Sequence, residues 1–392
     1  MRKDFLPFSS PLIGEEEINE VVDTLRTGWI TTGPKVKRFE EEFASYVGSP
    51  AALALNSGTA ALHVALATQG IGPGDAVITT PMTFCSTIHV IEQVGARPIL
   101  VDIEPDTLNI DPAKIEKMVK SAIRIPQSAI KALLPVHLYG HPCDMDPIMA
   151  LAQKYNLRVI EDGAHALPAK YKGNFIGTIG DLTAFSFYAT KNITTGEGGM
   201  LTGIPEMIEK ARIWSLHGMS QDAWRRYSDE GSWYYEVIYP GFKYNMSDIQ
   251  ASIGIHQLKR LSKFQVRRRE IVQRYNKTFS RLEELEIPIE RPEVEHAWHL
   301  YIIRLKLDRL KVIRNQFIEE LKFRNIGTSV HFIPIHLHPY YQNKYGFKPD
   351  DFPIAYREYQ RIISLPLYPK MTDQDVEDVI EAVTEIVRRF HL

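Results

Sequence analysis

The sequence contains little cysteine, and the two that it has form no recognisable motif. Its 392 residues include only Cys85 and Cys143, which are too far apart for the Cys-x-x-Cys spacing of zinc and redox sites. A chain of this length also needs no disulfide to stabilise its core. The cysteine content therefore gives no support for a zinc site or an oxidising compartment, and we expect a cytoplasmic protein.

The sequence also lacks an excess of charge and any long hydrophobic run. Its formal net charge is −2, and basic and acidic residues are interspersed, so no surface suited to nucleic acid or an anionic membrane is expected. No stretch of about 18 apolar residues offers a membrane span. The N-terminal segment reaches Pro11 before a signal-like apolar core can form. We therefore expect neither a nucleic-acid partner nor a membrane anchor.

The first half of the chain alternates short apolar runs with amphipathic stretches, which predicts an α/β fold. Helices are expected at 60–67 and 86–94. Seven strand candidates are Ala51–Leu55, Ala76–Thr80, Pro98–Asp102, Ile130–His137, Arg158–Glu161, Leu182–Phe187 and Gly199–Leu201. Strands that alternate with helices predict a seven-stranded, mostly parallel sheet with both faces covered. Such sheets bind ligands at the carboxyl ends of their strands.

The second half predicts a smaller α+β domain. A long helix is expected over Asp248–Leu282, with its N-cap at Ser247 or Asp248. The alternating segment Ala297–Leu305 predicts a strand, and helices are expected at 312–323 and 373–390. We therefore expect a large domain over residues 1–255 and a small C-terminal domain over residues 256–392.

A lysine lies between an apolar strand and a glycine-rich turn, in Ser186–Asn192 followed by Thr194–Gly199. Taken alone, Lys191 is most simply a solvated loop residue. An amine that attacks an aldehyde must instead be held by a rigid backbone and be deprotonated. Glycines at this place would let the chain turn tightly beneath a flat ring.

A second motif is the apolar strand that ends in acidic residues, Arg158–Ala166. Asp162 either forms a local turn or places its carboxylate against the nitrogen of a pyridine ring. In the second case the carboxylate would keep that nitrogen protonated. Ala164 is small enough to lie under such a ring. His165 is either structural or a hydrogen-bond partner for a phenolic oxygen on the ring.

Two further motifs follow strands and suit a flat, phosphorylated ligand. The segment Asn56–Ala60 passes from a strand into a helix, where backbone amides either receive an ordinary cap or bind phosphate. Ser186 is a second candidate phosphate ligand. Phe84 lies in a loop after a strand, where it either joins the core or stacks on the ring.

In this order, these strings resemble the DegT-type nucleotide-sugar aminotransferases, a branch of the fold-type I enzymes that use pyridoxal 5′-phosphate (PLP). The resemblance extends from Leu6 to Leu367 and includes Gly28–Pro34 and Gly241–Ala251. It implies the fold predicted above and PLP as cofactor. It also implies that Lys191 forms the Schiff base and that Asp162 pairs with the pyridine nitrogen N1. Phe84 would stack on the ring, and His165 would contact the cofactor. The phosphate would be held by Gly58, Thr59 and Ser186, and Asn245 would reach the phosphate of the neighbouring subunit. A homodimer would then be required for a complete site.

Within this family, three strings look most like those of enzymes that aminate C4 of UDP-4-keto sugars: Gly28–Pro34, Glu295–Leu300 and Asn325–Phe332. The greatest likeness is to the UDP-4-keto-pentose (4-amino-4-deoxy-arabinose) aminotransferases. The implied amino donor is L-glutamate, and the implied product serves polysaccharide or lipopolysaccharide synthesis. The residues expected at the sugar substrate are Trp29, Thr31 and His331. Substrates with a 3-keto or 4-keto-6-deoxy sugar, or with dTDP or GDP, stay open.

Two other functions are compatible with such a fold. A sugar 3-dehydratase that uses pyridoxamine phosphate typically has histidine in place of the Schiff-base lysine, so Lys191 argues against it. A non-catalytic regulatory protein is disfavoured by the intact Lys191, Asp162 and phosphate loop.

Three features remain after these assignments. His331, His336 and His338 lie close together, but no carboxylate or cysteine completes a ligand set, so no metal site is expected. The segment 222–239, rich in Trp and Tyr, is expected to shape either the substrate entrance or an interface. Gly163 stands where the family more often has alanine, and is expected to loosen the local packing slightly.

Overall fold

A seven-stranded sheet forms the centre of the protein in the computed structural model, which describes residues 2–122, 129–220 and 234–392. Its strands, in spatial order, are β1 (Ala51–Leu55), β9 (Gly199–Gly203), β8 (Leu182–Ser186), β5 (Arg158–Asp162), β4 (Ala129–Leu133), β2 (Asp75–Thr79) and β3 (Arg97–Leu100). β9 runs antiparallel to both of its neighbours, β1 and β8, and the other strand pairs of the sheet are parallel. The predicted α/β fold with a mostly parallel sheet is confirmed.

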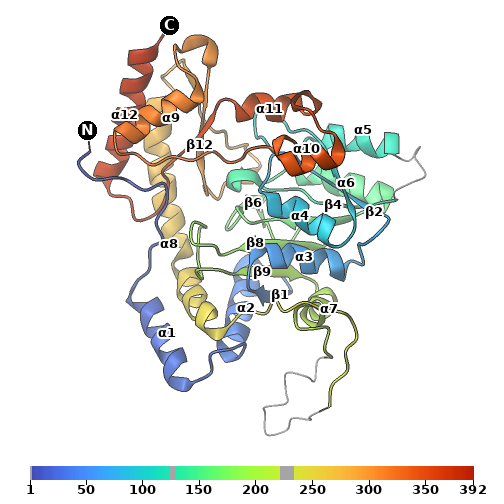
Figure 1. Ribbon diagram of the computed structural model, residues 1–392. Coiled ribbons are helices and arrows are strands. Elements are labelled where there is room, and N and C mark those ends of the chain that lie inside the picture. Colours follow the sequence, from blue (N-terminus) through green and yellow to red (C-terminus); the bar gives the residue numbers. More distant parts are fainter. Residues whose placement is uncertain (1, 123–128, 221–233) are drawn as a thin grey trace.

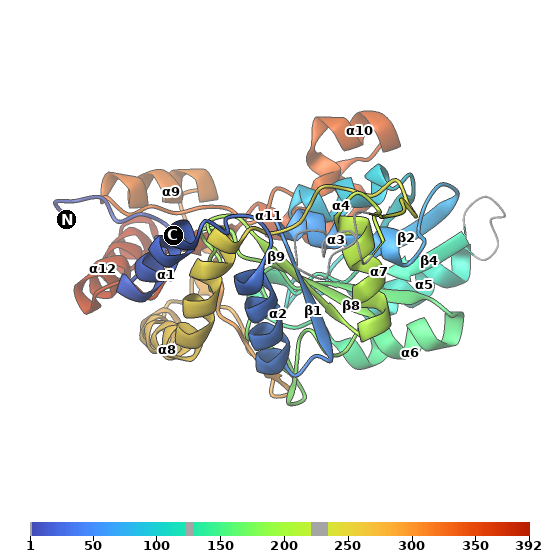
Figure 2. The same ribbon diagram turned by 90° about the horizontal axis from the view of Figure 1, so that it is seen from below.

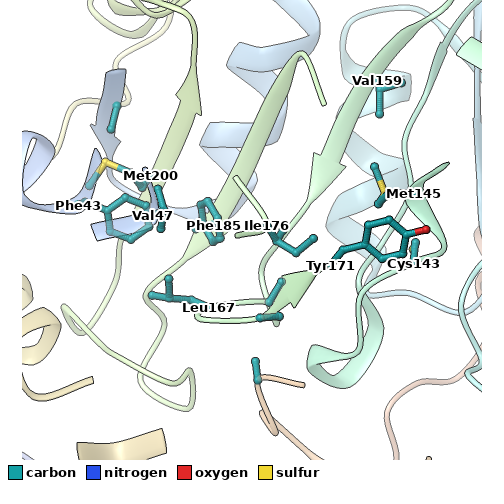
Figure 3. Packing of buried hydrophobic residues seen from close by; sticks show 14 of the residues in the cluster. Phe43, Val47, Cys143, Met145, Val159, Leu167, Tyr171, Ile176, Phe185 and Met200 are labelled. Carbon is teal, nitrogen blue, oxygen red and sulfur yellow. The ribbon is translucent and has the colours of Figure 1, made fainter. Parts of the chain in front are cut away.

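Helices cover both faces of this sheet, as Figures 1 and 2 show. One face packs against α3 (Gly58–Thr68), α4 (Cys85–Gln93) and α7 (Pro205–Ser215), and the other against α2 (Pro34–Val47), α5 (Pro112–Ala122), α6 (Met145–Tyr155) and the first half of α8 (Asp248–Phe279). Side chains of one strand alternate between the two cores because successive residues point to opposite faces. Leu182 and Ala184 thus belong to the α3 core, while Phe185 packs with Phe43 in the other, seen in Figure 3.

The C-terminal part forms a second hydrophobic core around an antiparallel sheet. This sheet contains β10 (Leu285–Glu286), β12 (Tyr301–Leu305) and β13 (Ile362–Leu365), packed against the end of α8, α9 (Arg314–Phe323) and α12 (Asp373–Phe390). The remaining elements are α1 (Glu15–Thr27), α10 (Pro339–Tyr345), α11 (Pro353–Tyr359), and a small sheet of β6 (Lys170–Tyr171), β7 (Asn174–Phe175) and β11 (Val294–Glu295).

The long helix α8 belongs to both cores. Its residues from Ala251 to Phe264 pack under the central sheet, and those from Ile271 to Phe279 pack in the C-terminal core. It begins at the expected N-cap, Ser247, whose side chain accepts a hydrogen bond from the Gln250 amide at 3.4 Å. The proposed boundary at residues 255 and 256 therefore falls inside a continuous helix, and that division stays a prediction.

Two expected strands are shorter than predicted. β4 ends at Leu133 rather than continuing to His137, because Pro135 has no amide hydrogen to donate to a neighbouring strand. β12 begins at Tyr301 rather than at Ala297. There Trp298 adopts a left-handed conformation with φ 47° while its ring stacks on His296 at 3.9 Å, and this conformation interrupts the extended chain.

No helix in the described ranges combines the length and the apolar character that a membrane span requires.

Of the segment 222–239, residues 222–233 lie outside the described residues. At its end, Tyr239 stacks on Trp214 with ring centroids 4.7 Å apart.

The contact between α8 and α2 generates a stability prediction at Gly254. A Cβ atom there would lie 2.6 Å from Phe39 Cζ and 2.9 Å from Thr195 Cγ2, and Phe39 is fully buried. We expect Gly254→Ala to lower the free energy of unfolding by roughly 1–3 kcal/mol through overpacking, despite the better helix propensity of alanine. Denaturant unfolding measures this change. Lys263→Ala on the exposed face of the same helix is the control, and a more stable Gly254→Ala variant would contradict the packing argument.

Candidate active site

The predicted site residues follow neighbouring strands of the central sheet. Asp162 is the last residue of β5, and Ser186 is the last residue of β8, whose following loop contains Lys191. Ser57 connects β1 to α3. The carboxyl ends of parallel strands lie at one edge of a sheet, so these residues gather there.

The Lys191 side chain is the central amine of this site. Burial lowers its pKa from 10.5 to about 8, and the Asp162 carboxylate partly opposes this change. At pH 7, roughly one amine in ten is then neutral, against fewer than about one in a thousand for an ordinary lysine. The tertiary structure thus provides the deprotonated amine that the chemistry predicted for this residue requires.

Asp162 is a buried carboxylate held on both of its oxygens. Oδ1 accepts a hydrogen bond from the Ala164 amide at 3.1 Å, and Oδ2 accepts one from the Thr87 hydroxyl at 2.8 Å. Burial raises the pKa of this carboxyl, while the two hydrogen bonds and the charge of Lys191 act in the opposite direction. Its backbone is fixed by bonds to Pro135 and His137.

His165 lies beside this pair as a neutral imidazole. Burial, followed by the charges of Lys191 and His331, lowers its pKa well below the ordinary value. The Tyr139 amide donates to its Nδ1 at 3.2 Å, so the ring hydrogen is carried by Nε2. His165 therefore has a donor to offer a ligand. Its ring stacks on Phe332, with centroids 5.8 Å apart.

The N-terminus of α3 approaches β8 so closely that only glycine fits. A Cβ on Gly58 would lie 2.8 Å from Ser186 Cβ, and a Cβ on Gly199 would lie 2.4 Å from the Ser57 carbonyl oxygen. The Ser57 hydroxyl caps the helix by accepting from the Ala60 amide at 3.0 Å. Ser186 thus lies against the first turn of α3, where helix amides and the dipole favour an anion.

His331 is the expected substrate residue that the fold brings to this site. Its Nδ1 lies 2.7 Å from the Ser364 hydroxyl, and its carbonyl accepts a hydrogen bond from the Tyr139 hydroxyl. Burial, and then the charge of Lys191, lowers its pKa to about 4. Phe84 borders the same region, since its half-exposed ring lies 5.8 Å from Phe332.

Trp29, Thr31 and Asn245 gather in a different place, around Thr32 between α1 and α2. The Asn245 amide donates to the Thr32 hydroxyl at 2.7 Å, and the Trp29 indole donates to the Thr32 carbonyl at 3.0 Å. The Thr31 carbonyl accepts from the Asp248 amide. Among the interactions of the described residues, none joins these side chains to Lys191 within one chain.

The other histidines of the 331–338 loop do not form a metal centre. His336 is fully buried and packs against Phe352, with ring centroids 4.9 Å apart. Across residues 2–122, 129–220 and 234–392, no group of three or more His, Cys, Asp or Glu side chains is arranged to hold a metal ion.

Sequence reasoning missed two buried groups behind Asp162. Glu161, fully buried, lies 2.8 Å from His137 Nε2 and accepts from the Gly180 amide and the Thr183 hydroxyl at the same distance. The second is Thr87, which is joined to Asp162 across the sheet edge. The one sequence signal for the Glu161 pair was His137, which follows an apolar strand. Thr87 lies three residues after Phe84, and no sequence pattern marked it as a partner of Asp162.

Gly163 lies close to β8 rather than beside a gap. A Cβ there would lie 3.1 Å from Thr183 Cγ2 and 3.2 Å from the Ala184 carbonyl oxygen. The expected loosening of the packing is therefore not found, because the backbone approaches β8 directly and fills the space.

Solved structures of similar architecture were determined with the cofactor. The sugar aminotransferase Spr1654 from Streptococcus pneumoniae, described as putative, is 38% identical, with TM-scores of 0.90 for its pyridoxamine-phosphate form and 0.89 for its PLP form. Each alignment covers 98% of this chain and 99% of the other. The fold, the partly buried lysine and the structural likeness together define a PLP-dependent sugar aminotransferase.

The sequence places the chain more narrowly within this class. It belongs to the DegT/DnrJ/EryC1/StrS aminotransferase family, whose profile matches residues 11–384. It is 55% identical to the spore coat polysaccharide biosynthesis protein SpsC of Bacillus subtilis over 389 residues, which covers 99% of this chain and 98% of SpsC. It is also 57% identical to the uncharacterized protein MJ1066 of Methanocaldococcus jannaschii over 388 residues, 99% of each chain.

The lowered pKa of Lys191 predicts a pH-dependent cost of folding in the cofactor-free protein. The charged amine is favoured in the unfolded chain, so the cost is complete below pH 8 and disappears as the pH rises towards 10.5. We expect Lys191→Met to stabilise the cofactor-free protein by on the order of 2 kcal/mol at pH 7, with most of the gain lost by pH 10.

Denaturant unfolding of the two proteins at both pH values measures this difference. Lys117→Met, at an exposed position, is the matched control and should change stability little at either pH. A Lys191→Met gain that is equal at pH 7 and pH 10 would show that burial does not depress the pKa of the amine.

Proposed function

We propose that this enzyme transfers the amino group of L-glutamate to C4 of a UDP-linked 4-keto sugar, producing a 4-amino-4-deoxy sugar nucleotide and 2-oxoglutarate. The observation that carries the proposal is the partly buried Lys191 amine, whose pKa is lowered to about 8 beside the Asp162 carboxylate. An amine of this kind can react with a carbonyl and can also accept and return a proton near neutral pH.

The described residues fit PLP. Lys191 would bind the aldehyde carbon, Asp162 would hold the proton on the pyridine nitrogen, and His165 would donate from Nε2 to the phenolic oxygen. The phosphate would be held by Gly58 and Thr59 at the start of α3 and by Ser186, where the absence of a Cβ on Gly58 keeps the cradle open. When bound, PLP supplies an electron sink that stabilises negative charge on the substrate carbon.

Lys191 would act as the proton carrier of both half-reactions. Its amine, once released from the cofactor, would remove the proton from Cα of glutamate and later deliver a proton to C4 of the sugar. The imidazoles of His165, His299 and His331 all have pKa values lowered by burial, so they stay neutral and do not compete for this proton.

The proposal includes a homodimer with a shared site. Asn245 would bind the phosphate of the neighbouring subunit, while Trp29 and Thr31 would contact its sugar substrate together with His331. In support, Trp29 and Ile30 are about half exposed, and Leu25 and Ile18 on α1 are also exposed. A cluster of exposed apolar side chains of this kind is typical of an interaction surface.

The biological setting is proposed from the relatives. SpsC carries the name of a polysaccharide biosynthesis protein, and we propose that the amino sugar made here serves a cell-surface polysaccharide. Cys85 and Cys143 are both free thiols, which agrees with a location in the reducing cytoplasm.

The assignment of Lys191 predicts the behaviour of one variant. Lys191→Ala removes the amine that would hold the cofactor covalently, so we expect the visible absorption of the bound cofactor and the catalytic turnover to be lost. Absorption spectra and a coupled assay for 2-oxoglutarate measure both. Lys117→Ala serves as the surface control, and turnover retained by Lys191→Ala would overturn the assignment.

The identity of the sugar is tested by a substrate panel. Wild-type enzyme is incubated with glutamate and UDP-, dTDP- or GDP-linked sugars that carry the ketone at C3 or C4, with and without a 6-deoxy group. We expect the highest kcat/KM with a UDP-4-keto sugar. A preference for a 3-keto sugar, or for dTDP or GDP, would replace this substrate while leaving the aminotransferase chemistry intact.

A further inference from the structure

Behind Asp162 lies a pair of buried threonines that no part of the proposed mechanism uses. Thr87, the third residue of α4, places its hydroxyl 2.8 Å from Asp162 Oδ2. The Thr83 hydroxyl lies 2.7 Å from that of Thr87. Thr87 is fully buried and Thr83 is 2% exposed, so water does not compete for either bond.

The direction of these hydrogen bonds follows from the chemistry of the groups. An ionised carboxylate only accepts hydrogen bonds, so Thr87 must use its single hydroxyl hydrogen to donate to Asp162. The remaining interaction of Thr87 is then with Thr83 as donor. The chain of donation therefore runs from Thr83 to Thr87 to Asp162, and each bond polarises the next.

We propose that Thr87, supported by Thr83, is a positioning residue that keeps Asp162 ionised and aimed at the pyridine nitrogen of PLP, so that the nitrogen stays protonated. The proposal rests on the assignment of Asp162 to that nitrogen. Burial alone favours the neutral carboxylic acid, which would take the proton from the ring. A hydroxyl donor on Oδ2 favours the carboxylate, and its bond to Thr87 leaves the proton on the nitrogen.

The geometry distinguishes this role from that of a hydrogen bond that only links a helix to the sheet. Oδ1 of Asp162 is already bound to the Ala164 amide, which belongs to the same loop. Thr87 comes from another element, 75 residues away in sequence, and supplies the only side-chain hydrogen bond to Asp162 among the described residues. The two bonds together leave the carboxylate little freedom to rotate.

The test uses holoenzyme reconstituted with PLP that carries ¹⁵N at the pyridine nitrogen. The chemical shift of this nitrogen reports whether it is protonated. We expect Thr87→Val to move the resonance towards that of neutral pyridine and to slow the glutamate half-reaction by on the order of tenfold. Thr87→Ser, which keeps the hydroxyl, should restore the wild-type shift. Thr83→Val should move the resonance in the same direction by a smaller amount.

Thr202→Val is the matched control, because the Thr202 hydroxyl is equally buried and donates to the Gly177 carbonyl at 2.9 Å without touching Asp162. It should leave the resonance unchanged. A wild-type resonance in Thr87→Val would overturn the inference, and so would an equal shift in Thr202→Val. If Thr87→Val does not bind PLP, the comparison of Thr83→Val with Thr202→Val decides.

Asp162→Asn separates this inference from the assignment on which it rests. If Asp162→Asn shifts the resonance and Thr87→Val does not, Asp162 pairs with the ring and the role of Thr87 is refuted. If Asp162→Asn leaves the resonance unchanged, the assignment of Asp162 and the inference both fail.

Discussion

The partial burial of Lys191 beside the buried Asp162 carboxylate is the interaction on which the rest of the site depends. Burial makes the ammonium ion unfavourable, and the carboxylate partly restores it, which leaves the pKa of the amine at about 8. A fully exposed lysine would stay charged, and an amine buried without Asp162 would have a still lower pKa. The surrounding imidazoles are neutral for the same reason, so the charge of the site is concentrated in these two groups.

The central sheet makes this pairing possible. β5 and β8 are parallel neighbours, so Asp162 and the loop that follows Ser186 emerge at the same edge. The close contact between Gly58 and Ser186 brings the start of α3 to that edge as well. One arrangement of strands therefore places an amine, a carboxylate and the N-terminus of a helix at one edge of the sheet.

Much of this was predictable because the relevant patterns are local. The strand that ends in Asp162, the lysine before a glycine-rich turn and the cap at Ser57 are each read from fewer than about ten residues, and hydrophobic periodicity is strongest over such windows. The strand expected at Ala297–Leu305 was wrong at its start because hydrophobic alternation does not record the left-handed backbone conformation that Trp298 adopts. The hydrogen bond of Thr87 to Asp162 was not predicted, because the two residues are 75 positions apart and hydrophobic periodicity reports only on neighbouring residues.

The sequence by itself determined the succession of strands and helices along the chain, the candidate residues Lys191 and Asp162, and the family to which the chain belongs. It did so because hydrophobic spacing and short motifs are properties of neighbouring residues. Only the tertiary structure decided that desolvation lowers the pKa of Lys191 to about 8, that His165 presents its Nε2 hydrogen, and that two threonines support Asp162. Desolvation and hydrogen-bond direction depend on groups that are distant in sequence, and they exist only after the chain has folded.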